Sequence, residues 1–202
     1  MAVALRYEGG RGRPYAAQLR ADGRRLMALL GVAGCELSVV IAGDDFVHAL
    51  NREFRGKDRA TDVLSFSQLE ETTSEEMPSD TAYPGRRRGR IAPAPPPLGP
   101  AAGAALGDVV ISVDTARRQA RRFGVAPAAR MRTLLVHGLL HLLGYDHERS
   151  PADARRMFAR ERELAAALRR ISSRAPASAR PKPRSSKPRP RSAKAKLRGA
   201  KK

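Results

Sequence analysis

Three of the four histidines in this 202-residue chain lie within eleven positions, at His137, His141 and His147. Because His137 and His141 are four residues apart, a helix places both imidazoles on one face, one turn apart. Gly144 tolerates the left-handed backbone that ends a helix, so the chain can turn back and bring His147 to the same point. Any one of these residues alone would be interpreted as a hydrogen-bonded histidine of the core. Three neutral imidazoles with an open fourth position are typical of a catalytic zinc site.

The same histidine spacing occurs in zinc proteases of the metzincin type. Those enzymes carry a glutamate directly after the first histidine, where it activates the attacking water. This chain has Gly138 at that position, so the sequence argues against a protease. Two interpretations of the glycine are open: it leaves room for a bulky substrate beside the metal, or a neighbouring strand packs closely against it.

Alternating strands and helices must position the histidines. Apolar patterning predicts strands at 2–7, 37–41, 63–66 and 107–113, and helices at 15–30, 44–54, 114–123, 127–143 and 150–171. The helix at 44–54 places Phe46, Val47, Leu50 and Phe54 on one apolar face. The helix at 127–143 is apolar nearly all round, which predicts a central position. We therefore expect one α+β domain over residues 1–171, with a small mixed sheet packed with helices and the metal-binding helix in the core.

Two segments lack this patterning. Residues 68–106 pass from acidic to basic to proline-rich sequence and are predicted to form a flexible insertion, because such composition buries too little apolar area to offset chain entropy. Residues 172–202 contain 12 of the 39 Lys and Arg residues and no acid, which predicts a disordered basic tail. The tail either attaches the protein electrostatically to RNA or is a solubilising extension.

Composition and charge exclude some classes of protein and favour others. The formal net charge is +19, which favours a polyanionic partner. The single cysteine, Cys35, excludes an intrachain disulfide framework, and we interpret it as a small buried apolar residue with no disulfide-linked partner. Neither a signal peptide nor a membrane-spanning apolar run is visible. We expect a soluble cytoplasmic protein with no membrane partner.

Three motifs resemble one known family. They are HGLLHLLGYDH at 137–147, LNREFRGKDRATDVLSF at 50–66 and LGDVVIS at 106–112. Their order and spacing are similar to those of the YbeY family of ribosomal RNA maturation endoribonucleases, over about residues 36–165. The long connection at 68–106 and the basic tail depart from that family's pattern.

The resemblance implies a zincin-like α+β fold with one Zn²⁺ per chain, held by the three histidines. It further implies single-strand-specific cleavage of RNA, notably in maturation of the 16S ribosomal RNA 3′ end and in ribosome quality control. The implied partners are single-stranded RNA, ribosomal RNA and the small ribosomal subunit.

Cleavage of RNA requires a group that binds the phosphodiester. The planar guanidinium of arginine stays charged and binds two phosphate oxygens at once. Arg55 is the predicted catalytic arginine, since it matches the arginine that the family uses for activity. Lys57 and Arg59 are predicted to bind flanking phosphates. The alternative for all three is a solvated surface charge. Two attacking groups are open: a zinc-bound hydroxide or the ribose 2′-hydroxyl.

Other residues have weaker assignments. Asp108 and Asp146 either orient a ligand imidazole or satisfy backbone donors. His48 is expected on a helix surface or at the edge of the core. Three functions compete: a zinc endoribonuclease, a zincin-type metalloprotease, and a non-catalytic ribosome-assembly factor in which zinc only stabilises the fold.

Overall fold

A computed structural model describes residues 2–9, 12–69 and 100–174 of the chain. Within these residues, four strands form one mixed sheet in the order β1-β2-β4-β3. β1 (Ala2–Tyr7), β2 (Glu36–Ala42) and β4 (Ala105–Ser112) run parallel, and β3 (Val63–Ser67) pairs antiparallel to β4 at the edge.

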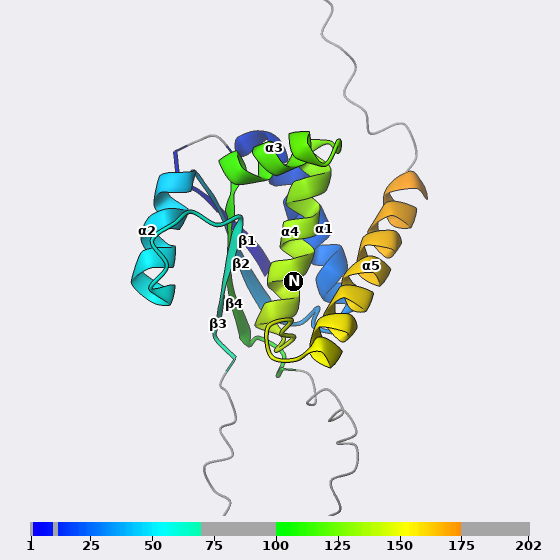
Figure 1. The fold of residues 1–202 in the computed structure, drawn as a ribbon. Helices are drawn as coiled ribbons and strands as arrows, with labels where there is room; N and C mark the ends of the chain where they lie inside the picture. Colours follow the sequence, from blue (N-terminus) through cyan, green and yellow to red (C-terminus); the bar gives the residue numbers. More distant parts are fainter. Residues whose placement is uncertain (1, 10–11, 70–99, 175–202) are drawn as a thin grey trace, which may run out of the picture.

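Helices cover both faces of the sheet (Figure 1). The helical segments are η1 (Arg13–Tyr15), α1 (Ala16–Leu29), α2 (Asp44–Arg55), α3 (Val113–Arg122), α4 (Pro127–Leu142) and α5 (Pro151–Arg174). Helix α2 lies on one face, and α1 and α4 lie on the other. Helix α5 packs outside α4 and α1, while α3 lies at the end where α4 begins. In the described part of the chain, no helix is long and apolar enough to cross a membrane.

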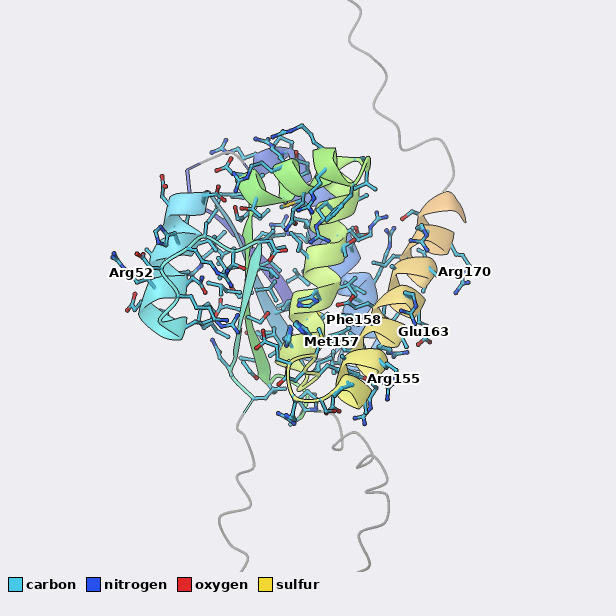
Figure 2. All side chains as sticks on the ribbon, in the orientation of Figure 1. Arg52, Arg155, Met157, Phe158, Glu163 and Arg170 are labelled. Carbon is cyan, nitrogen blue, oxygen red and sulfur yellow. The ribbon has the colours of Figure 1, made fainter. Side chains whose placement is uncertain are left out.

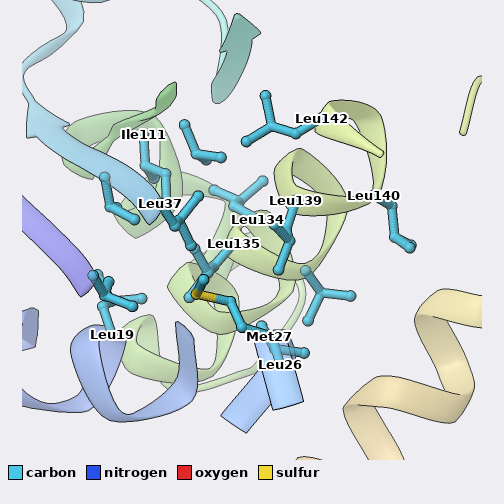
Figure 3. Close-up of a cluster of buried hydrophobic side chains, with 14 of the residues drawn as sticks. Leu19, Leu26, Met27, Leu37, Ile111, Leu134, Leu135, Leu139, Leu140 and Leu142 are labelled. Carbon is cyan, nitrogen blue, oxygen red and sulfur yellow. The ribbon is translucent and has the colours of Figure 1, made fainter. Parts of the chain in front are cut away.

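Helix α4 lies at the centre of the main core. Leu135 and Leu139 of α4 are fully buried with Leu26 and Met27 of α1 and with the sheet residue Ile111 (Figure 3). Burial on nearly all sides explains why the α4 sequence shows no polar face. The predicted α+β class with a small mixed sheet is confirmed, and the helix that carries His137 and His141 lies in the core, as predicted.

Most element boundaries differ from the prediction by one to three residues. Strand β4 begins inside the predicted insertion, because Ala105 pairs with Glu36 and Leu106 is fully buried. Helix α3 begins at Val113, since the Ser112 hydroxyl caps it by accepting a bond from the Thr115 amide. Helix α5 continues to Arg174, beyond the predicted end at 171. Most of the predicted insertion and nearly all of the basic tail lie outside the described residues.

Cys35 is buried in the main core, 2% exposed, as predicted. Its thiol lies 3.6 Å from the carbonyl oxygen of Ala101 in the segment that leads into β4.

Gly138 marks the closest approach of α4 to the sheet. A β-carbon added there would lie 2.6 Å from Cγ1 of Val109 on β4 and 3.1 Å from the Ser65 hydroxyl on β3. The Ser65 hydroxyl also donates a bond to the Gly138 carbonyl. Of the two interpretations of this glycine, close packing of a strand is therefore confirmed, and room for substrate is wrong.

Gly138→Ala tests this packing. We expect the free energy of unfolding to fall by about 1–3 kcal/mol from overpacking, partly offset by the higher helix propensity of alanine. Urea denaturation followed by circular dichroism measures the change. Combining Gly138→Ala with Val109→Ala makes room for the methyl group, so the double variant should lose less stability than the sum of the two single variants. Additive losses would contradict the steric explanation.

Asp44 ties α2 to the start of α3. Its carboxylate accepts bonds from the Ser112 and Thr115 hydroxyls and lies 2.6 Å from the Arg118 guanidinium. Partial burial acts to raise the pKa of Asp44, but the bonds from Arg118, Ser112 and Thr115 outweigh burial and hold this pKa below its ordinary value. The stability that the carboxylate contributes is therefore present above about pH 4 and lost as the pH falls through the lowered folded-state pKa.

Asp44→Asn should lower the free energy of unfolding by about 1–3 kcal/mol at pH 7, because bonds to a charged acceptor are weakened. The difference from the unmodified protein should shrink below about pH 4, because Asp44 of the unfolded chain takes up a proton there, and it should be lost once the pH falls through the lowered folded-state pKa. Urea denaturation at pH 7 and pH 3 measures both values. Asp45→Asn, at an exposed neighbouring position, is the matched control, and an equal loss there would contradict the assigned role of Asp44.

Candidate functional site

The three histidines of the predicted metal site meet where α4 ends. His137 and His141 lie one turn apart on the last part of α4. Gly144 follows with φ of 81°, and its amide bonds to the His141 carbonyl. This left-handed residue reverses the chain and returns His147 to the other two rings. The ring centroids are 4.6, 5.1 and 5.2 Å apart.

The ring nitrogens are arranged as metal ligands. Nε2 of His137 and Nε2 of His141 are 3.0 Å apart, and one ligand atom from each of the three histidines lies within 4.8 Å of the others. Burial, and then the neighbouring His137 and His147, lower the pKa of His141 and favour its neutral form. Neutral imidazole is the form that binds a metal. The donor set therefore fits a single divalent metal ion.

Glu161 on α5 orients one of these rings. Its carboxylate Oε1 lies 2.6 Å from Nδ1 of His137, and both side chains are partly buried. A carboxylate at Nδ1 keeps the proton on that nitrogen and leaves the Nε2 lone pair free to bind a metal. Sequence analysis missed Glu161. The available signal was an acid on the same helical face as the buried residues Met157 and Leu164.

The two carboxylates considered for this orienting role have other partners. Asp108 accepts a bond from the Gln68 side chain. Asp146 accepts a 2.7 Å bond from the backbone amide of Glu148, and this bond is the main cause of its lowered pKa. Asp146 thus shapes the turn that carries His147, in line with the backbone-satisfying alternative.

Phe158 of α5 supports the third ring. It stacks on His147 with ring centroids 5.7 Å apart and an angle of 23° between the planes. Figure 2 shows Phe158 on the side of α5 that faces α4, whereas Glu163 and Arg170 point outward from the same helix. Helix α5 therefore contacts two of the three histidines, through Glu161 and Phe158.

The histidines open into a cleft of about 630 Å³ that Arg55, Lys57 and Arg59 also line. Arg55 is the last residue of α2, and Gly56 ends the helix in a left-handed conformation with φ of 62°. The Arg55 guanidinium lies 3.7 Å from the carboxylate of Glu148, next to His147 in sequence. Both side chains are largely exposed, so this ion pair contributes little stability. The structure thus places all three predicted cations in one cleft with the histidines.

The loop at 56–62, which carries Lys57 and Arg59, is fastened to α2 at two points. The Asn51 side chain, which is buried, donates a 2.7 Å bond to the Arg59 carbonyl. His48 lies 2.7 Å from Asp58. His48 is on the helix surface, as expected, and it holds the loop instead of binding the metal.

Asp62 fastens the far end of the loop. Its carboxylate accepts bonds from Arg130 at 3.1 Å and from Gln119 at 3.0 Å. Arg130 and Gln119 belong to α4 and α3, so the loop that carries the cleft cations is bonded to the helix that carries the histidines. The sequence identified the loop but not these long-range partners.

Because residue 138 is a glycine, the site lacks the glutamate on which a zincin-type protease depends. Even a β-carbon at this position meets Val109 at 2.6 Å, so a glutamate side chain does not fit between α4 and the sheet. In the part of the chain that the structure describes, the orienting carboxylate is Glu161, which bonds to a ligand nitrogen. The site has no counterpart of the protease's general base at its usual position.

Glu161→Gln should weaken binding of a divalent metal about 10- to 100-fold, because an amide holds the His137 ring in the ligating form less strongly. Competition with a chromogenic chelator for added Zn²⁺ measures the affinity without an activity assay. Glu163→Gln is the matched control, since Glu163 is on the same helix, points outward and pairs with Arg160. Equal affinities for the two variants would show that Glu161 does not position the ligand.

Comparisons with known proteins agree with this geometry. Residues 23–169 match the family described as Endoribonuclease YbeY. A protein of that name from Anaeromyxobacter sp. (strain Fw109-5) is 48% identical over 167 residues, which cover 83% of this chain and 72% of the relative. Another, from Geobacter metallireducens, is 43% identical over 154 residues, 76% of this chain and 86% of the relative.

A solved structure shows the same fold. The solution structure of a Thermotoga maritima protein aligns with a TM-score of 0.52 and 21% sequence identity, over 89% of this chain and 99% of that one. At this identity the likeness concerns the fold alone. The matched family and the identities of its curated members together show that this chain belongs to the Endoribonuclease YbeY family.

Proposed function

We propose that this protein is a zinc-dependent endoribonuclease that cleaves single-stranded RNA, with His137, His141 and His147 as the metal ligands and Arg55 as the catalytic arginine. One observation carries the proposal: three imidazoles converge in a cleft that also holds Arg55, Lys57 and Arg59. Family membership supplies the substrate class, because the curated relatives are named as endoribonucleases. Zinc is proposed because it favours nitrogen ligands in a four-coordinate site that keeps one position open.

The bound metal would supply Lewis acidity at the scissile phosphodiester. The protein's own residues account for positioning. Arg55 is the last residue of α2, which ends at Gly56. The Arg55 guanidinium lines the cleft and can bind phosphate oxygens there when its ion pair with Glu148 opens. Lys57 and Arg59 line the same cleft and are proposed to hold the adjoining phosphates. Glu161 holds the proton on Nδ1 of His137 and keeps the ring in place.

The wider role follows from the family alone. We propose that the RNA is ribosomal, that processing concerns the 3′ end of 16S ribosomal RNA and ribosome quality control, and that the small ribosomal subunit is the partner. A cytoplasmic location and a role of the basic tail in RNA attachment stay predictions, as does the division into a domain at 1–171 and a tail.

Arg55→Ala should lower kcat/KM for cleavage of a single-stranded oligoribonucleotide about 100- to 1,000-fold, as expected when one donor to the developing charge is removed. Its metal content by mass spectrometry should be unchanged. Arg52→Ala is the matched control, because Arg52 is on the same helix and points away from the cleft in Figure 2. His141→Ala should lose both metal and cleavage.

The competing functions give different results in the same assays. A metalloprotease would cleave casein and keep that activity in Arg55→Ala. A ribosome-assembly factor would bind zinc and cleave neither substrate. Full RNA cleavage by Arg55→Ala, or by the unmodified protein after complete removal of metal, would overturn the proposal.

A further inference from the structure

We propose that Phe54 is a stacking platform for an unpaired nucleobase of the substrate, next to the phosphate held by Arg55. The inference rests on the proposed function and names a contact that selects the substrate. Its basis is the position of an exposed aromatic ring in the cleft that the three cations and the three histidines also line.

Phe54 is more exposed than the other apolar residues on its face of α2. Apolar periodicity places Phe46, Val47, Leu50 and Phe54 on one face of this helix. In the structure only Val47 of these is fully buried, and Phe54 is 59% exposed. A single exposed apolar residue is common on protein surfaces. What distinguishes Phe54 is that its ring lines the cleft shared with the three histidines.

Phe66 holds the Phe54 ring in place. The two rings make an edge-to-face contact with centroids 5.2 Å apart and an angle of 71° between the planes. Phe66 belongs to β3 and packs against the buried cluster of Leu64 and Val110 beneath α2. The Phe54 ring is thus supported by Phe66 of the sheet, while Phe54 stays 59% exposed and lines the cleft. Such a preorganised ring can accept a base without first losing side-chain entropy.

The other exposed phenylalanines are engaged elsewhere or lie outside the cleft. Phe123 lies beneath the guanidinium of Arg130, 5.4 Å from the ring centroid. Phe158 stacks on His147. Phe46, 39% exposed, is two turns away on α2 and does not line the cleft. Among the described residues, Phe54 is therefore the ring best placed to meet a substrate base.

Charge and ring together match the chemistry of an unpaired strand. Proteins that bind single strands combine cations along the backbone with aromatic rings on which bases stack. Because Phe54 and Arg55 line the same cleft, one nucleotide can place its base on the ring and its phosphate on the guanidinium. A base within a duplex is already stacked on its neighbours and is not free to cover the ring. Stacking at Phe54 would therefore favour unpaired RNA over duplex RNA.

Steady-state kinetics test the ring's contribution. Phe54→Ala should raise KM for a single-stranded oligoribonucleotide about 5- to 100-fold with little change in kcat, because stacking stabilises the bound substrate and the transition state alike. Phe54→Leu keeps an apolar contact with Phe66 but removes the aromatic face, so it should behave like Phe54→Ala. Phe54→Tyr should restore the low KM. Rescue by leucine would mean that Phe54 has only a packing role.

The absence of tryptophan from this sequence allows a direct optical test. Phe54→Trp introduces a single indole, whose fluorescence should be quenched on rapid mixing with a single-stranded oligoribonucleotide. An abasic oligomer of the same length and charge should leave the emission nearly unchanged. Phe46→Trp, on the same helix but outside the cleft, is the matched control and should not respond to either oligomer.

The outcomes separate this inference from the proposed function. If the unmodified protein cleaves RNA but Phe54→Ala keeps its KM and the Phe54→Trp emission is unaffected, the stacking contact is wrong and the endoribonuclease stands. Equal quenching by the abasic oligomer would also overturn stacking. If the unmodified protein cleaves no RNA while base-dependent quenching persists, the proposed catalytic function fails and a nucleobase-binding site remains.

Discussion

Two imidazoles one turn apart on a buried helix can meet a third that follows closely in sequence only if the helix ends near them and the chain reverses direction. Helix α4 satisfies this constraint. It contributes Leu135 and Leu139 to the core, carries His137 and His141 near its C-terminal end, and stops before Gly144. The same helix must also lie close to the sheet, which is possible because Gly138 has no side chain. The position of the metal site is thus set by the packing of α4, and the cleft is built around that position.

Local spacing predicted the parts of the site that lie close together in sequence. The meeting of His137, His141 and His147 follows from helical periodicity and one glycine, and the position of Arg55 follows from the end of α2. The order of strands and helices was also predictable from apolar patterning. Boundaries were less so, since Ala105 and Leu106 join β4 through pairing with β2, a contact that composition does not reveal.

Contacts between distant segments were not predictable in the same way. Glu161 is 24 residues from His137, and Asp62 is 68 residues from Arg130, so no short motif links either pair. Periodicity placed Phe54 on one face with Val47 but could not show its exposure, because an apolar stripe indicates which residues share a face but not where the covering element stops. β3 lies at the sheet edge, and the ring at the end of α2 extends past the cover that the sheet provides. The proposed base-stacking surface lies where a residue of the apolar face is exposed.

The bond between Glu161 and His137 has a thermodynamic consequence beyond the orientation of one ring. Helix α5 contacts α4 through buried apolar residues and through the Glu161 carboxylate. The packing of α5 against α4 and the binding of a metal at the candidate site are therefore thermodynamically linked. Reciprocity requires that, if a bound metal favours packing of α5 against α4, this packing favours metal binding by the same coupling free energy. A metal on the histidines would therefore make α5 harder to detach from α4.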